Sequence, residues 1–360
     1  MSTQNNLWNK KTKLETPLIL CILLIVMAIT IIVAISVGQV KVPIDQTFKI
    51  LIYKILGIQM NGLNIESNLY LNVVWLIRLP RILTACCIGM GLAVCGTIMQ
   101  ASVQNPLADP YILGVSSGAT LGATFIILIG ISSLPIIGQV GIAFGAFTGA
   151  LIASILVLMF ANIGGRSTST KLVLSGTVID SMFSSFSSMI IYFSNNSQGL
   201  QSVTFWIMGS VARSTWSTLP LLAVIVTGSV AFFCTQFRTL NVMLMGDEQA
   251  TTLGINLSFY RKLYLALTAL ITGIMVANCG MIGFVGLIIP HITRALVGSD
   301  HKKLLPIAVL FGGIFMILTD LIARILINGV EIPVGIITAA FGAPVFLYML
   351  VKKDYGFGGK

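Results

Sequence analysis

Charge is scarce in this sequence of 360 residues. Charged side chains make up only 9% of it, whereas hydrophobic side chains make up 56%. Soluble domains carry roughly 25% charged residues, and a soluble fold of this length has no way to hide so much apolar surface. The apolar runs are long and are separated by short polar turns, which is typical of a bundle of membrane-spanning helices. The composition therefore excludes an ordinary soluble enzyme or binding module.

Several kinds of functional site are also missing from the sequence. No G-x-x-x-x-G-K-[ST] phosphate-binding loop occurs, so we expect that this chain does not hydrolyse ATP itself. The six cysteines lie in apolar runs without a C-x-x-C pair, and the two histidines are too few for a metal site. No basic patch with interleaved aromatic residues suggests a nucleic-acid partner. We expect no cofactor on this chain, and a membrane-embedded enzyme lacks a convincing nucleophile or base.

About ten apolar segments are long enough to cross a bilayer, which takes about 20 residues. Residues 1–16 are predicted to form a cytoplasmic tail, and amphipathic segments near 41–72 and 194–215 to lie on the outer surface. With the N-terminus inside, 14 of the 21 lysines and arginines fall on the cytoplasmic side, which predicts that both termini are cytoplasmic. The predicted spans lie near 17–38, 81–101, 112–130, 136–161, 171–193, 216–235, 263–279, 282–297, 306–326 and 334–351.

An internal repeat is visible when the chain is shifted by 184 residues. In the predicted topology the first copy enters the membrane from outside and the second from inside. Such inverted repeats are common in transporters. The matched pairs are Gly89 with Gly273, Cys95 and Gly96 with Cys279 and Gly280, Pro106 with Pro290, and Gly114 with Gly298.

The stretch from Arg78 to Gly122 organises the chain. Two arginines flank a proline at the mouth of an apolar run, and a turn rich in Asn, Pro and Asp follows that run. This stretch resembles the FecCD family of ATP-binding-cassette importer permeases, which import ferric siderophores, haem and cobalamin. The residues that carry the resemblance are Arg78, Pro80, Arg81, N-P-L-A-D-P at 105–110, G-V-S-S-G at 114–118, G-F-V-G-L-I-I-P-H at 283–291, G-S-D-H at 298–301, I-P-V-G at 332–335 and G-A-P at 342–344.

The resemblance implies an all-α integral membrane permease, made of one domain over residues 1–360, in a bacterial cell membrane. It also implies a dimer, homo- or heteromeric, with a central pathway. The implied partners are two ATP-binding subunits, which would hold ATP and magnesium, and an extracytoplasmic substrate-binding protein. The expected cargo is an iron complex, most often a ferric siderophore in this family, with haem and cobalamin left open.

Three arginines are candidates for docking the binding protein. Arg78 and Arg81 are expected at the outer start of the second span and Arg324 at the outer end of the ninth. The resemblance matches them to arginines that meet acidic residues of the binding protein, a task that suits the planar guanidinium. The alternative is that they snorkel to the membrane interface. Asp320 lies four residues before Arg324, so a pair on one helix face is also expected.

The connection at 236–262 is the longest on the cytoplasmic side. Gly246 and Gly254 are predicted to bracket a short helix, and the resemblance places here the region that couples to the ATP-binding subunit. An ordinary solvated loop is the alternative. The expected coupling residues are Leu244, Met245, Gly246, Asp247, Glu248, Ala250, Leu253 and Gly254.

The hydroxyl-rich turn at 164–171 contains two further candidates. By resemblance, Ser169 and Thr170 fall where the family narrows its pathway at the inner gate, although either could simply cap the next helix. Asp180 and Asp320 lie inside predicted spans, where acids are functional candidates by default. These two acids support the rival prediction, a proton-coupled secondary transporter.

Overall fold

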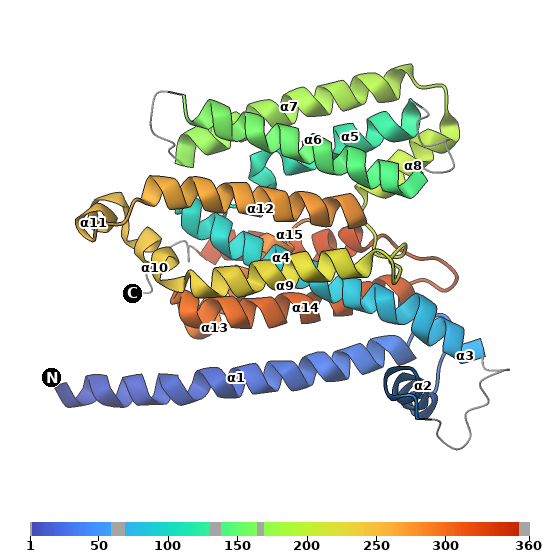
Figure 1. Cartoon of the computed structure of the whole chain (residues 1–360), viewed down its shortest axis with the longest axis horizontal. Coiled ribbons are helices and arrows are strands. Elements are labelled where there is room, and N and C mark those ends of the chain that lie inside the picture. Colours follow the sequence, from blue (N-terminus) through green and yellow to red (C-terminus); the bar gives the residue numbers. More distant parts are fainter. Residues whose placement is uncertain (1, 59–68, 130–137, 164–168, 353–360) are drawn as a thin grey trace.

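The structure, a computed structural model, describes residues 2–58, 69–129, 138–163 and 169–352, and within these ranges the fold is all-helical. Figure 1 shows the helices running roughly alongside one another in a layered bundle. The long helices are α1 (Ser2–Ser36), α4 (Leu79–Val103), α5 (Val115–Leu128), α6 (Gly138–Ala161), α7 (Ser169–Phe193), α9 (Leu219–Thr235), α12 (Leu257–Cys279), α13 (Val285–Val297), α14 (His301–Ile325) and α15 (Val334–Lys352). The shorter ones are α2 (Ile44–Leu56), α3 (Leu69–Asn72), η1 (Val73–Arg78), η2 (Pro110–Leu113), α8 (Ser197–Ile207), α10 (Phe237–Met245) and α11 (Asp247–Thr252).

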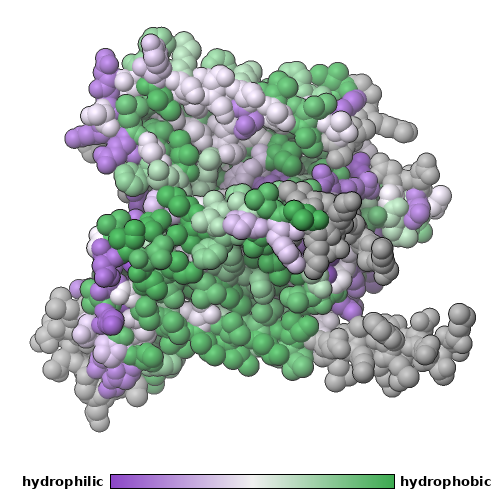
Figure 2. Space-filling model, turned by 180° about the vertical axis from the view of Figure 1, so that it is seen from behind, coloured by the Kyte–Doolittle hydropathy of each residue, from purple (hydrophilic) through white to green (hydrophobic). Residues whose placement is uncertain are grey.

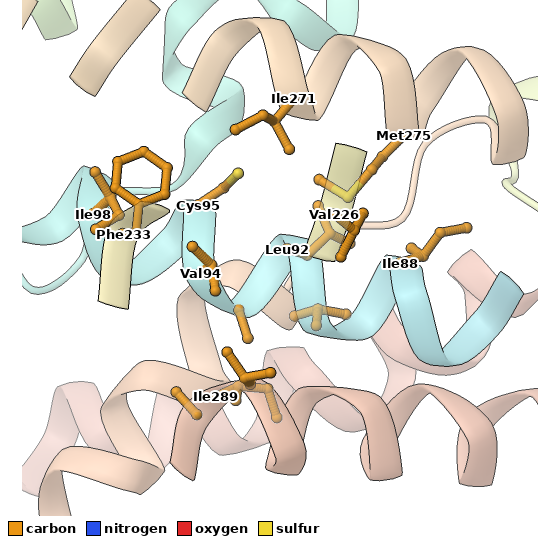
Figure 3. Close-up of a cluster of buried hydrophobic side chains, with 14 of the residues drawn as sticks. Ile88, Leu92, Val94, Cys95, Ile98, Val226, Phe233, Ile271, Met275 and Ile289 are labelled. Carbon is orange, nitrogen blue, oxygen red and sulfur yellow. The ribbon is translucent and has the colours of Figure 1, made fainter. Parts of the chain in front are cut away.

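Helix α4 is the centre of the molecule, and nearly all of its residues are buried. It packs against α9, α12, α13 and α14. Gly89 faces the backbone of Gly312 on α14, and Gly96 faces that of Gly286 on α13, so closely that an added Cβ would overlap a carbonyl oxygen. Small residues let helix backbones approach in this way. Figure 3 shows the apolar cluster that results, formed by Ile88, Leu92, Val94, Cys95 and Ile98 of α4 with Val226, Phe233, Ile271, Met275 and Ile289.

Helices α5, α6 and α7 form a second cluster on one side of α12, while α1 lies on the far side of the molecule (Figure 1). Where α5 crosses α6, Gly118 faces Gly149 and Gly122 faces Gly145, with no room for a Cβ at any of the four. These glycines therefore serve packing within the chain. Helix α7 is the outermost helix of this cluster (Figure 1).

Each of the ten predicted spans coincides with a helix. Among the described residues, five helices are long and apolar enough to cross a membrane, and α9 with α10, which bend by 60° at their junction, make a sixth if taken as one span. Helices α5, α13 and most of α15 are apolar but shorter. Figure 2 shows a broad apolar face over the body of the molecule, with most hydrophilic residues toward its left and right ends.

The turn after α4 follows its sequence closely. Gln104 adopts a left-handed backbone with φ of 54°, and Asn105 accepts a hydrogen bond from the N–H of Leu107 at 2.9 Å. The carboxylate of Asp109 caps η2 by accepting from the N–H of Tyr111 at 2.9 Å. Gly114, with φ of 71°, then starts α5. Side-chain caps of this kind are the reason Asn and Asp favour turns.

Two helix boundaries differ from the sequence predictions. The second span is longer than 81–101, because one helical stretch runs over the 34 residues from Tyr70 to Val103. Pro80 lacks an N–H, and the wider π-turn of η1 just before it accommodates the proline without ending the helix. Residues 2–16, predicted as a tail, are helical and continuous with α1.

The internal repeat can be followed in the helices. The 184-residue shift carries much of α4 onto α12, and the matched Gly89 and Gly273 lie within these two helices. Further along the register slips, because Pro106 lies in the turn after α4 whereas its match Pro290 lies inside α13. The shift therefore aligns α4 with α12 but not the segments that follow them.

Candidate functional site

The three arginines predicted for docking lie inside the molecule, next to one another. Arg78 and Arg81 are each 5% exposed and Arg324 is 4% exposed. Arg81 Nε donates to Asp320 Oδ1 at 2.8 Å, and Arg324 Nε lies 3.1 Å from Asp320 Oδ2. Arg81 Nη1 also donates to both carboxylate oxygens of Glu331 at 3.0 Å. The predicted pair of Asp320 and Arg324 is therefore present. We call the five residues Arg78, Arg81, Asp320, Arg324 and Glu331 the arginine cluster.

The cluster also holds the end of α1. Arg78 donates to the carbonyl oxygens of Ile35 at 2.6 Å, Ser36 at 3.1 Å and Val40. Arg324 Nη2 donates to Ala34 O at 3.1 Å. The last carbonyls of a helix have no partner within it, and a guanidinium satisfies several at once. A Cβ on Gly38 would lie 2.6 Å from Arg78 Nη2, so only a glycine leaves room for the guanidinium at this position.

The structure adds internal partners to the three residues predicted for docking, and their docking role stays a prediction. Arg78 and Arg81 were expected at the outer start of the second span, and Arg324, with Asp320 as a local partner, at the outer end of the ninth. All three guanidiniums have acceptors inside the chain. Glu331 is the accessible member of the cluster, because its side chain is 45% exposed whereas that of Asp320 is fully buried.

The coupling region forms the predicted short helix at the opposite end of the molecule (Figure 1). Helix α11 lies between Gly246, with φ of 100°, and Gly254, with φ of 74°. Both glycines have open space around the Cβ position, so the backbone angle and not crowding demands them. Met245 and Leu253 are exposed, whereas Ala250 is buried and its carbonyl accepts from Ile255 N at 3.1 Å. Leu244 packs against the α4 cluster.

A hollow of about 410 Å³ lies beside α11, lined by Thr239, Gly254, Ile255, Asn256, Phe259 and Tyr260. It combines an exposed aromatic ring, that of Phe259, with polar side chains. The exposed side chains of Met245 and Leu253, which lie on either side of α11, and this hollow together make a surface suited to a partner subunit.

Direct hydrogen bonds join the coupling region to the centre of the bundle. Gln104 Nε2 at the end of α4 donates to Met243 O at 2.7 Å, and Arg261 Nε donates to Ser102 O at 2.8 Å. Asn241 donates to Asp300 Oδ1 at 2.8 Å and accepts from His301 N at 2.9 Å, at the start of α14. These hydrogen bonds tie α10 to the end of α4 and to the start of α14.

Helix α7 carries a polar face that the sequence analysis missed. Only one narrow row of its residues is buried, and much of the rest is exposed. Among the exposed residues, the polar ones recur three or four positions apart, which places them on one face. This polar face consists of Thr170, Thr177, Asp180, Ser181, Ser184, Ser185 and Ser188. The Ser and Thr spacing was the signal, but only Thr170 and Asp180 of this face were singled out from the sequence.

The predicted inner-gate residues lie at the start of this helix. Ser169 begins α7, and Thr170 is exposed at the same end as the coupling region. Thr170 belongs to the polar face, so it lies in line with Thr177 and Ser181. Residues 164–168 of the preceding turn lie outside the described residues.

The FecCD transport family matches residues 23–352. The chain belongs to this family. A vitamin B12 import system permease from Citrobacter koseri is 40% identical over 281 residues, which cover 78% of this chain and 83% of that protein. A molybdate import system permease from Haemophilus influenzae is 33% identical over 344 residues, covering 94% and 97%. A solved structure described as an inward-facing putative metal-chelate type ABC transporter matches with a TM-score of 0.79 and 32% identity, covering 93% of this chain and 99% of that one.

The chain is thus the permease component of an ABC importer, an integral protein that crosses the membrane several times. It is a transport component and not an enzyme. Family membership disfavours the rival prediction of a proton-coupled secondary transporter. Asp320, one of the two acids behind that rival, is fully buried in ion pairs with Arg81 and Arg324.

Proposed function

We propose that this permease imports an iron complex, with a ferric siderophore as the first candidate. Two copies of the permease, or one copy and a close relative, enclose a central pathway with their α7 polar faces. Two ATP-binding subunits supply the energy, and an extracytoplasmic binding protein delivers the cargo. The single observation that carries the proposal is the polar face of α7. The carboxylate of Asp180 on a membrane helix is unfavourable against lipid, because the hydrocarbon offers it neither water nor a hydrogen-bond donor, and six hydroxyl residues share its face.

The proposed energy input follows the hydrogen bonds of the coupling region. An ATP-binding subunit that grips α11 and the adjacent hollow pushes on α10, whose Met243 and Asn241 are tied to α4 and α14. Helix α4 is packed without gaps at its glycines, so it moves as a rigid body rather than absorbing the push. The alternating opening of the pathway would then be a rigid movement of packed helices.

The proposed docking of the binding protein works through Glu331 and Arg81. Glu331 accepts two hydrogen bonds from Arg81 and is half exposed, so an acidic side chain of a partner reaches Arg81 by taking the place of Glu331. Nη1 of Arg81 keeps a carboxylate partner throughout the exchange. Arg78 and Arg324, which hold the end of α1, position this site rather than contacting the partner directly.

The proposed cargo class rests on resemblance and relatives. A metal chelate agrees with the description of the solved inward-facing transporter, and cobalamin agrees with the vitamin B12 relative. Haem or cobalamin import is therefore the second candidate function, with the same architecture and the same partners.

Reconstitution in liposomes tests the proposed function. The permease alone should transport no cargo, with or without a proton gradient across the membrane. With its cognate ATP-binding subunit inside and binding protein outside, it should take up the cargo only when ATP is present. Gradient-driven uptake by the permease alone would overturn the proposal.

A further inference from the structure

Asp180 has an unusual position for a charged residue. It is the only charged residue between Lys171 and Arg213, and it lies near the middle of the 25-residue helix α7. Its side chain is exposed, and within the part of the chain that the structure describes no hydrogen bond or ion pair engages it. A bare carboxylate at the centre of a bilayer is strongly unfavourable against lipid, so its surroundings in the working protein are aqueous.

The other faces of α7 show which side meets lipid. The buried row, which includes Leu172, Ile179 and Phe183, packs on the rest of the chain. A separate exposed row is apolar and suits lipid or another apolar surface. It contains Val178 at 65% exposed, Met182 at 38%, Phe186 at 51%, Met189 at 58% and Phe193 at 69%. Helical spacing places Asp180 at the edge of the polar face farthest from this apolar row, whereas Ser185, seven residues after Val178, borders the row. Asp180 and the apolar row therefore have different neighbours.

The hydroxyl groups of the polar face make it richer in acceptors than in donors. Thr177 donates to Val173 O at 2.9 Å and Ser181 to Thr177 O at 2.9 Å. Ser185 and Ser188 likewise donate to the carbonyls four residues earlier, at 2.8 and 2.9 Å. These hydroxyl protons are therefore committed to the helix itself, and the oxygen lone pairs are left to face outward. Together with the carboxylate they give this face a negative potential, and within the described residues no cation pairs with Asp180.

We propose that Asp180 sets the charge class of the cargo: the pathway admits complexes that are neutral or positively charged and rich in N–H or O–H donors, and it disfavours anions. This inference rests on the proposed function, because the second copy brings a second Asp180 to the same pathway. The cargo preference proposed here is opposite to that named for the molybdate import system relative, whose cargo is an oxyanion. A ferric tris-hydroxamate, in which three single negative charges balance Fe³⁺, fits the pathway, and a ferric tris-catecholate anion does not.

A cysteine reporter tests the electrostatic part without requiring transport. Ser184→Cys places a thiol one helical turn from Asp180, and its reaction with a cationic and an anionic methanethiosulfonate is compared, after subtraction of the parent chain's own reaction. The cationic reagent should react faster, and Asp180→Asn should lower the cation-to-anion rate ratio by about tenfold, since the one charge acts on both reagents in opposite directions.

Two controls make this measurement decisive. Asp45→Asn on α2 removes an exposed carboxylate that pairs with Lys49, away from α7, and should leave the rate ratio unchanged. Val224→Cys, on an exposed apolar position of α9, should react with neither reagent in a membrane. An unchanged ratio in Asp180→Asn, or no reaction of Ser184→Cys with either reagent, would overturn the proposal.

The charge class itself is tested with a panel of cargoes. Ferric tris-hydroxamate, cobalamin, haem, ferric tris-catecholate and molybdate are offered to the cognate binding protein, and the bound ones to the complete importer. ATP-dependent uptake of a neutral or cationic complex is expected, and an anion as the preferred cargo would overturn the charge class. Failure of all ATP-driven uptake, with the cysteine ratios as expected, would count against the proposed function and leave the electrostatic role of Asp180 in place.

Discussion

The arginine cluster and the polar face of α7 treat ionisable residues in opposite ways. In the cluster, three guanidiniums and a fully buried carboxylate lie among helices, and each guanidinium donates to a carboxylate or to the carbonyls at the end of α1. On α7, one carboxylate is exposed among hydroxyls that bond to their own helix. The difference teaches that charge in this protein either ties helices together or faces outward, and the two arrangements should respond differently to mutation.

The largest expected effect is on stability, at Asp320. Asp320→Ala leaves the guanidiniums of Arg81 and Arg324 buried without their shared carboxylate, and breaking a buried pair in this way costs about 3–5 kcal/mol. Thermal unfolding in detergent should show a clear loss of stability, whereas Asp180→Ala should change it by less than about 0.5 kcal/mol. Similar losses in both variants would break the comparison.

The cluster also changes how docking is tested. Charge reversal at Arg81 would place a new carboxylate beside Asp320 and Glu331, so lost uptake in Arg81→Glu would report damage to the fold as readily as lost docking. Reversal of Arg78 has the same defect, because its guanidinium holds Ile35 and Ser36. Variants at the exposed edge of the cluster are more informative.

Gly246→Pro tests whether ATP-driven motion enters through the coupling region around α11. Proline cannot adopt the positive φ that Gly246 requires, so the join between α10 and α11 must change. ATP-dependent uptake should fall by about tenfold or more, a coupling loss of at least about 1.4 kcal/mol. The fold and the cation preference at α7 should remain.

The matched control for this variant is Gly228→Ala on α9. Gly228 has open space at its Cβ position and no positive φ, so the alanine should leave both uptake and stability unchanged. Normal uptake in Gly246→Pro would contradict the coupling role.

Glu331→Gln should have a moderate effect, and in the opposite direction. The substitution removes the carboxylate that competes with a partner's acid for Arg81, while Asp320 continues to pair with Arg81 inside. The affinity of the binding protein for the permease should therefore rise a few-fold at low salt, and the gain should shrink as salt screens the charges. Surface plasmon resonance on the purified permease measures both. A weaker or unchanged affinity would argue that Arg81 only holds the structure.

The smallest effect is expected at Ser185 on the polar face. Its hydroxyl bonds only to Ser181 O in its own helix, so Ser185→Ala should change stability by less than about 0.5 kcal/mol. Uptake should fall by less than about twofold, because the carboxylate of Asp180 remains. A loss of stability comparable to that of Asp320→Ala would show that this face is packed against protein and not against water.

Much of this protein was predictable from local sequence. Long apolar runs predict membrane helices because every backbone polar group must be satisfied within the helix. The Asp320–Arg324 pair follows from four-residue spacing, and the short helix α11 follows from the two glycines that bracket it. Each of these features depends on residues close together in the chain, where spacing alone determines geometry.

Tertiary structure alone decided which charges are satisfied. Arg81 finds its partners 239 and 250 residues later in the chain, and Arg324 reaches a carbonyl of α1 that lies 290 residues earlier. No spacing rule predicts such contacts, because they depend on how α1, α4 and α14 pack. The same packing buries one row of α7 and leaves the row of Asp180 uncovered, so only the fold separates the acid that holds helices together from the acid that faces outward.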